Sequence, residues 1–214
     1  GAALQFLTGV VVADPDSPQF SGGSLTVALG SHASGDRLQI VDGNGTAVVA
    51  GVVKFNGTAI GTVSGGNGSD LVVAFTSSSA TTGAAAALLG QVAFSNSSEN
   101  PTWAGAKPDR SVTVTLDDGG NTGTGGAKTD VFTGTFSVVG VNDAPVLSGV
   151  SGTSANLYVQ GGSAVLIDGS AVLADADLQA LNEGVGSGNW SGSGLVLSRQ
   201  GGASADDVFG ASGT

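Results

Sequence analysis

Short apolar runs alternate with clusters of glycine, asparagine, serine and aspartate along most of the chain. In "SVTVTL" (111–116) and "FTGTFSV" (132–138), apolar residues recur at every second position, which is typical of half-buried strands. "DGNG" (42–45), "FNGT" (55–58) and "SGGNGSD" (64–70) carry the glycines that hairpin turns need. The pattern predicts strands over 2–12, 24–29, 37–41, 47–55, 58–63, 71–76, 90–95, 110–116 and 131–141.

One stretch departs from this pattern. "ATTGAAAALLGQ" (80–91) is rich in alanine and leucine, which are strong helix formers. A helix this short is not stable alone, so we expect a single helical crossover near 82–90 that packs on a sheet. The elements together predict an all-β protein built from antiparallel sandwiches.

An internal repeat runs through the chain. "GAALQFLTGVVVADPDSP" from Gly1 aligns without a gap with "GSAVLIDGSAVLADADLQ" from Gly162, at an offset of 161 residues. We therefore expect two domains: a nearly complete sandwich repeat at 1–142 and the first part of the next repeat at 143–214. The first copy has no counterpart of "APVLSGVSGTSANLYVQ" (144–160), which predicts an open sheet edge beside 2–7.

The charge balance limits the function classes. The chain has 17 acidic and 6 basic residues, a net charge of −11, and this argues against a nucleic-acid-binding protein. An acidic surface suits divalent cations. There is no cysteine, so disulfides are excluded, and no stretch of about 20 apolar residues predicts a membrane span.

Pairs of carboxylates fall at predicted strand ends. In an antiparallel sandwich the final strand of copy one delivers Asn142 and Asp143 to one pole, to which Asp175 and Asp177 of copy two should return. On an extended backbone the two aspartates of a D-x-D pair point the same way, and their oxygens suit Ca²⁺. An Asx turn followed by a soluble loop is the alternative interpretation. An equivalent, incomplete half-site is predicted at the other pole from Asp14, Asp16, Asp117 and Asp118.

"VNDAP" (141–145), followed by Asp175-Ala176-Asp177, resembles the pattern of cadherins. "GTAIGTVSGGNGSDLVVAFT" (57–76) and "RSVTVTLDDGG" (110–120) look more closely like the cadherin-like tandem repeats of giant bacterial RTX-type adhesins and biofilm surface proteins. The resemblance implies Ca²⁺ bound between consecutive repeats, at an extracellular or cell-surface location. Cadherins usually have a further aspartate upstream of the linker, where this chain has "VVGV" (138–141).

Other candidate residues are few. His32 is the only histidine, and no nucleophile motif accompanies it, so we predict that the chain is not an enzyme. Trp103 and Trp190 lie in loops rich in small polar residues, where an indole either anchors the loop or stacks on a sugar of a surface glycan.

Three functions follow from these observations. The first is a Ca²⁺-rigidified structural or adhesive repeat whose partners are neighbouring repeats of the same protein. The second is a self-assembling filament subunit in which identical chains exchange strands at the open edge. The third is a carbohydrate-binding module that uses Trp103 or Trp190.

Overall fold

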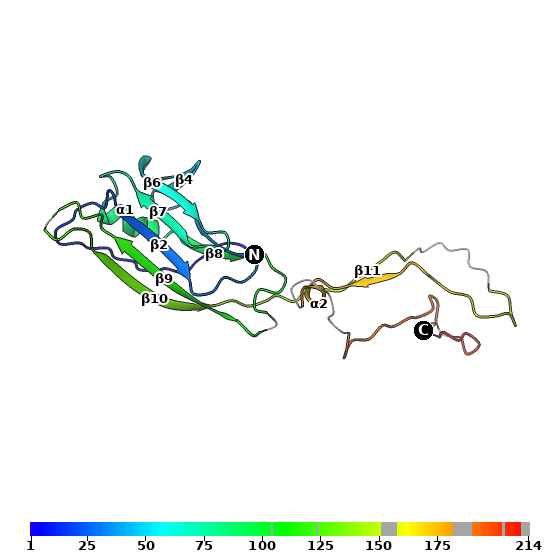
Figure 1. The fold of residues 1–214 in the computed structure, drawn as a ribbon. Helices are drawn as coiled ribbons and strands as arrows, with labels where there is room; N and C mark the ends of the chain where they lie inside the picture. The colour runs from blue at the N-terminus through cyan, green and yellow to red at the C-terminus, as the bar shows by residue number, and fades with distance from the viewer. Residues whose placement is uncertain (104, 123, 151–157, 182–189, 203, 211–214) are drawn as a thin grey trace. The chain divides into compact units, whose positions relative to one another are not determined.

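A computed structural model describes residues 1–214 except 104, 123, 151–157, 182–189, 203 and 211–214 (Figure 1). The chain divides into two compact units, Gly1–Val141 (unit 1) and Asn142–Thr214 (unit 2). Within the described residues, no helix has the length and apolar character needed to cross a membrane.

Two antiparallel sheets form unit 1. The larger has seven strands in the order β10-β9-β2-β7-β6-β5-β4, and the smaller has three in the order β1-β8-β3. The strands of the larger sheet are β2 (Ser24–Leu29), β4 (Thr46–Val49), β5 (Val52–Phe55), β6 (Thr58–Gly65), β7 (Leu71–Phe75), β9 (Asp109–Asp117) and β10 (Thr129–Ser137). Those of the smaller sheet are β1 (Leu4–Gln5), β3 (Asp36–Ile40) and β8 (Val92–Asn96). This confirms the prediction of an all-β antiparallel sandwich.

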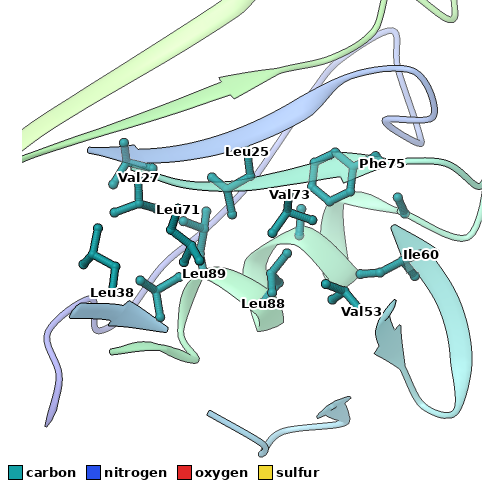
Figure 2. Close-up of a cluster of buried hydrophobic side chains, with 14 of the residues drawn as sticks. Leu25, Val27, Leu38, Val53, Ile60, Leu71, Val73, Phe75, Leu88 and Leu89 are labelled. Atoms are coloured by element: carbon teal, nitrogen blue, oxygen red, sulfur yellow. The ribbon is translucent and has the colours of Figure 1, made fainter. Parts of the chain in front are cut away.

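The core follows the two-residue period of the strands. On β2 the buried positions alternate with half-buried ones, so that Leu25, Val27 and Leu29 face inward. Figure 2 shows Leu25 beside Val73 and Val27 beside Leu71 of β7, with Leu88 of the helix α1 (Thr82–Leu89) pointing into the same cluster. Alternation of apolar and polar residues therefore determines which face of each strand is buried.

The predicted crossover helix is α1. The side chain of its N-cap residue, Thr81, accepts a hydrogen bond from the amide of Ala84 at 3.2 Å, which satisfies one of the free amides of the first turn. Ala84, Ala85, Leu88 and Leu89 are buried against the sheets. A helix of eight residues is not stable in isolation, so this packing is what maintains it.

Two predicted strands are wrong in their extent. The expected strand 47–55 is a hairpin of β4 and β5, because Ala50 (φ 50°) and Gly51 (φ 79°) form a left-handed turn. The expected strand 2–12 pairs only at Leu4–Gln5, with β8, and Gly9 at φ 66° interrupts the extended backbone. β1 is the terminal strand of the smaller sheet, and among the described residues its strand partner is β8 alone, so its outer edge has no strand partner.

Unit 2 has few regular elements among its described residues. β11 (Val146–Ser148) pairs antiparallel with β12 (Val172–Ala174), and α2 (Ala176–Ala180) follows directly. Val146 and Leu147 are 58% and 54% exposed. This two-stranded sheet gains little from burial, so its stability in isolation is marginal.

A buried ion pair joins the two sheets of unit 1. Arg110 occupies an inward position of β9, and its Nε donates to Oδ2 of Asp36 on β3 at 2.7 Å. Both residues are 1% exposed. The guanidinium also donates to the carbonyls of Pro101 and Lys107, while Asp36 accepts from the amide of Ala33. The desolvated charges are thus fully hydrogen-bonded, as burial of an ion pair requires.

We expect Asp36→Ala to lower the free energy of unfolding by about 3–5 kcal/mol, because it leaves the Arg110 guanidinium buried and unpaired. Urea denaturation measures the loss. The double variant Asp36→Leu/Arg110→Met should lose less, since no charge remains in the interior. As a control, Asp70→Ala removes a partner of His32 whose side chain is 50% exposed, and should cost less than about 1 kcal/mol. A loss at Asp36 as small as the loss at Asp70 would contradict this account.

Candidate calcium-binding sites

Asp14 and Asp16 lie in a tight loop of unit 1. The Oδ1 atom of Asp14 accepts hydrogen bonds from the amides of Asp16 at 3.1 Å and Ser17 at 2.9 Å. These two bonds orient the Asp14 carboxylate toward the backbone of its own loop. The carboxyl group of Asp16 lies within hydrogen-bonding reach of the Asp14 side chain.

The two carboxyl groups have opposite pKa shifts. The amide of Ser17 is the main cause that lowers the pKa of Asp14, because a hydrogen bond to the charged form stabilises it. The hydrogen bond with Asp14 is the main cause that raises the pKa of Asp16, followed by desolvation and then by the negative charge of Asp14. The negative charge of Asp16 is therefore disfavoured beside Asp14, and a nearby cation would offset this electrostatic effect.

Asp118 brings a third carboxylate to this loop. The negative charge of Asp118 also raises the pKa of Asp16, and Asp118 itself is only 9% exposed. Its Oδ1 accepts from the amides of Gly120 and Lys128, both at 2.8 Å, so its position is determined by backbone contacts. Asp117 accepts from the amide of Gly119 in the same turn, but its charge is not among the causes that raise the pKa of Asp16. The structure thus brings together three of the four aspartates predicted for this half-site.

Thr122 is a neighbour of this cluster that sequence reasoning missed. Its hydroxyl donates to the carbonyl of Asp16 and lies 3.0 Å from the hydroxyl of Ser17. These residues are about a hundred positions apart in the chain, and a threonine in a glycine-rich turn gives no signal of such a contact. Hydroxyl and carbonyl oxygens are both suitable calcium ligands.

The cluster is an open one. Within the described part of unit 1, no three carboxylates have oxygens that all lie within 4.8 Å of one another. The cluster lies at the Asp117 end of β9, whereas β10 runs back to pair Ser137 with Asp109 at the other end. Nine residues of strand separate these ends by about 27 Å. The chain therefore leaves unit 1 at the pole opposite to the cluster.

In unit 2 the predicted residues also meet. The amide of Asp143 donates to Oδ2 of Asp177 at 2.6 Å, and the Asn142 side chain donates to the carbonyl of Asp143 at 3.0 Å. The expectation that Asp175 and Asp177 lie on one extended strand is wrong. Asp175 caps α2 by accepting from the amide of Leu178 at 3.0 Å, and Asp177 lies in the first turn of that helix. An aspartate before helix-forming residues favours a cap over a continued strand.

The two repeat copies share this capping geometry. Asp14 and Asp175, which align at the offset of 161 residues, each accept from the amide three positions ahead, at Ser17 and Leu178. The first carboxylate of each D-x-D pair is thus held by the backbone, and the second is left to interact with other groups. The correspondence found in the sequence extends to atomic contacts.

The remaining candidates have ordinary contacts. Nε2 of His32 lies 3.5 Å from Oδ1 of Asp70, and Nδ1 is buried without a hydrogen-bond partner. Nζ of Lys107 lies 4.0 Å from the centre of the Trp103 ring, so one face of this indole is covered by an ammonium group. Trp190 is half-buried, and its carbonyl accepts from the amide of Ser193.

Comparisons of the chain with models of protein families, with curated proteins and with solved structures found no match.

We predict that Asp16→Asn raises the melting temperature at neutral pH in the presence of a chelator. Because the folded-state pKa of Asp16 is raised, its stabilising contribution is present below the unfolded pKa of about 4 and is lost as the pH rises. Asparagine mimics the protonated form of Asp16, so the variant does not lose this stability as the pH rises. The difference in melting temperature between the variant and the parent should shrink as the pH falls to about 4.

Asp14→Asn is the matched control. The folded-state pKa of Asp14 is lowered, so its contribution is present above the unfolded pKa and is lost as the pH falls. This variant should therefore melt below the parent at neutral pH. Equal effects of the two substitutions would contradict the opposite pKa shifts of Asp14 and Asp16.

Proposed function

We propose that this chain is a Ca²⁺-rigidified structural repeat of a large extracellular or cell-surface protein. The observation that carries the proposal is the loop of unit 1 in which the Asp14 carboxylate accepts from the amides of Asp16 and Ser17, with Asp118 near enough for its charge to raise the pKa of Asp16. Neighbouring carboxylates that are charged at neutral pH repel one another unless a cation balances them. A site of this kind favours an ion with several oxygen ligands, and Ca²⁺ takes six to eight.

The residues divide into two candidate ligand sets. In unit 1 they are Asp14, Asp16 and Asp118, with the Thr122 hydroxyl as a neutral donor. In unit 2 they are Asn142, Asp143, Asp175 and Asp177. Asp117 has a weaker case, because its charge is not among the causes that shift the pKa of Asp14 or Asp16. A bound Ca²⁺ ion would supply positive charge to each set and would limit the motion of the loops that carry the ligands.

The composition supports an extracellular setting. Free Ca²⁺ is abundant outside cells, where calcium-binding modules typically have dissociation constants of about 10⁻⁴–10⁻³ M. A net charge of −11 is consistent with a protein that works alongside such cations. The function is therefore mechanical: the repeat holds neighbouring parts of a long protein at a distance. It requires no catalytic residue, and His32 is given no such role.

We expect Ca²⁺ to raise the stability of unit 1 in differential scanning calorimetry. At a free concentration about 100 times the dissociation constant, the ion should add roughly 2.7 kcal/mol to the free energy of unfolding. Asp14→Asn/Asp16→Asn should abolish this gain, because it removes both charges and keeps acceptor oxygens in place. Asp175→Asn/Asp177→Asn should leave the unit 1 gain intact and remove any Ca²⁺ response of unit 2.

Asp42→Asn is the control for unit 1. It also removes one exposed negative charge, far from the candidate ligands in sequence, and keeps the oxygen that accepts from Val48. Its calorimetric response to Ca²⁺ should equal that of the parent. If chelation leaves the unit 1 transition of the parent unchanged, the calcium function is wrong.

A further inference from the structure

A large groove lies along one side of unit 1. Its volume is about 770 Å³, and it runs between the segment 6–14 and the outer strands β9 and β10. Most of its lining is apolar, including Val10, Val12, Val112, Leu116, Phe132 and Phe136. At one end, Phe136 stacks on Phe6 with ring centres 4.9 Å apart, which closes the sandwich there. The rest of the groove is open.

Both walls of the groove have unpaired backbone. β10 is the last strand of the seven-stranded sheet (Figure 1), and among the described residues its only strand partner is β9. The opposite wall, 10–13, belongs to no strand. Phe132 is 57% exposed and Val11 is 86% exposed, although the sequence predicts a strand at each position. Unpaired edges of this kind accept a further strand.

In unit 2, the segment equivalent to the wall 10–13 already has a strand partner. At the repeat offset of 161 residues, Val172–Ala174 corresponds to 11–13. Val172–Ala174 is β12, and it pairs antiparallel with β11, with Val146 opposite Ala174 and Leu147 opposite Leu173. Transferred to unit 1, this register places Val146 opposite Ala13, Leu147 opposite Val12, and Ser148 opposite Val11.

We propose that the groove of unit 1 binds the strand Val146–Ser148 of a second copy of this chain, so that unit 2 of one chain completes unit 1 of the next. Within unit 2, β11 belongs to an exposed sheet of two strands. Transfer to the groove keeps the same type of backbone pairing and moves Val146 and Leu147 from water onto an apolar surface. The exchange is therefore favourable for the donated strand.

The partner is a second copy because the strand whose register fits this groove, Val146–Ser148, belongs to unit 2 of the same sequence. Donation in one direction leaves the unit 1 groove of the donor free for another chain. A heterologous contact of this kind produces linear polymers when it does not close into a ring. The inference goes beyond the calcium function, because the strand contacts involve none of the proposed ligands.

Cysteine cross-linking tests the register directly, since the chain has no cysteine of its own. Val12→Cys and Leu147→Cys are made in separate chains, mixed in chelator and oxidised. Facing residues on paired strands have the separation that a disulfide requires. The expected major product is a covalent heterodimer that reduction reverses, whereas each variant oxidised alone should give much less dimer.

A matched control replaces the donor position. Val196→Cys is also an exposed apolar site of unit 2 (87% exposed) but lies outside β11. When mixed with Val12→Cys, it should give only the background level of dimer. Equal yields with Leu147→Cys and Val196→Cys would overturn the proposal. An intramolecular disulfide as the main product of a chain carrying both Val12→Cys and Leu147→Cys would overturn it too.

Sedimentation of the parent chain in chelator provides an independent measurement. The parent should form oligomers whose size grows with concentration. Leu147→Asp should abolish this growth, because it would place a charge in the apolar groove. Leu195→Asp, at a site that is 79% exposed in unit 2, should leave it unchanged. A parent that remains monomeric, or association that Leu147→Asp does not weaken, would contradict strand exchange. Because Ca²⁺ is absent, neither result depends on the calcium proposal.

Discussion

The buried pair of Arg110 and Asp36 is the interaction on which the rest of unit 1 depends. It connects β9 of the large sheet with β3 of the small one and satisfies both charges inside the sandwich. The pairing places Arg110 near one end of β9, while Asp117 and Asp118 follow at the other end. The acidic pole and the walls of the groove are both carried by β9 and its neighbour β10. Both the proposed calcium site and the proposed strand-binding groove therefore depend on the position of β9.

Repetition is the second constraint. A similar short sequence occurs at 11–16 (VVADPD) and at 172–177 (VLADAD). In the second copy it has a strand partner, β11, whereas in the first it borders an open groove. In both copies the first aspartate accepts from the amide three residues ahead. The shared contacts indicate that the two stretches are structurally equivalent, and the difference between them identifies what the first copy can bind.

Most of the strands could be predicted because their burial follows the alternation of residues. β2 and β7 agree closely with the predicted limits, since glycine-rich turns interrupt the chain on either side of them. The turn at Ala50 was missed because alanine seldom adopts a positive φ. The groove could not be recognised from composition, because its apolar lining residues look like ordinary core residues in the sequence.

The acidic residues were harder to interpret. Their grouping at 14–16 with 118 followed from strand direction, but the helix that begins after Asp175 did not, because a D-x-D pair has no fixed backbone conformation. Arg110 could have been identified as buried, since it shares the inward positions of Val112 and Val114 on β9. Its partner Asp36 is 74 residues away, and local sequence contains no signal of that distance.

The most direct test of the central claim is a Ca²⁺ titration followed by two-dimensional amide NMR of the isotope-labelled chain. The account predicts that shifts concentrate on the amides bonded to the proposed ligands. These are Ser17 and Lys128 in unit 1 and Asp143 and Leu178 in unit 2. Saturation should occur at concentrations on the order of 1–10 mM. Shifts distributed evenly over all aspartates, or no shift at these amides up to about 10 mM, would contradict it.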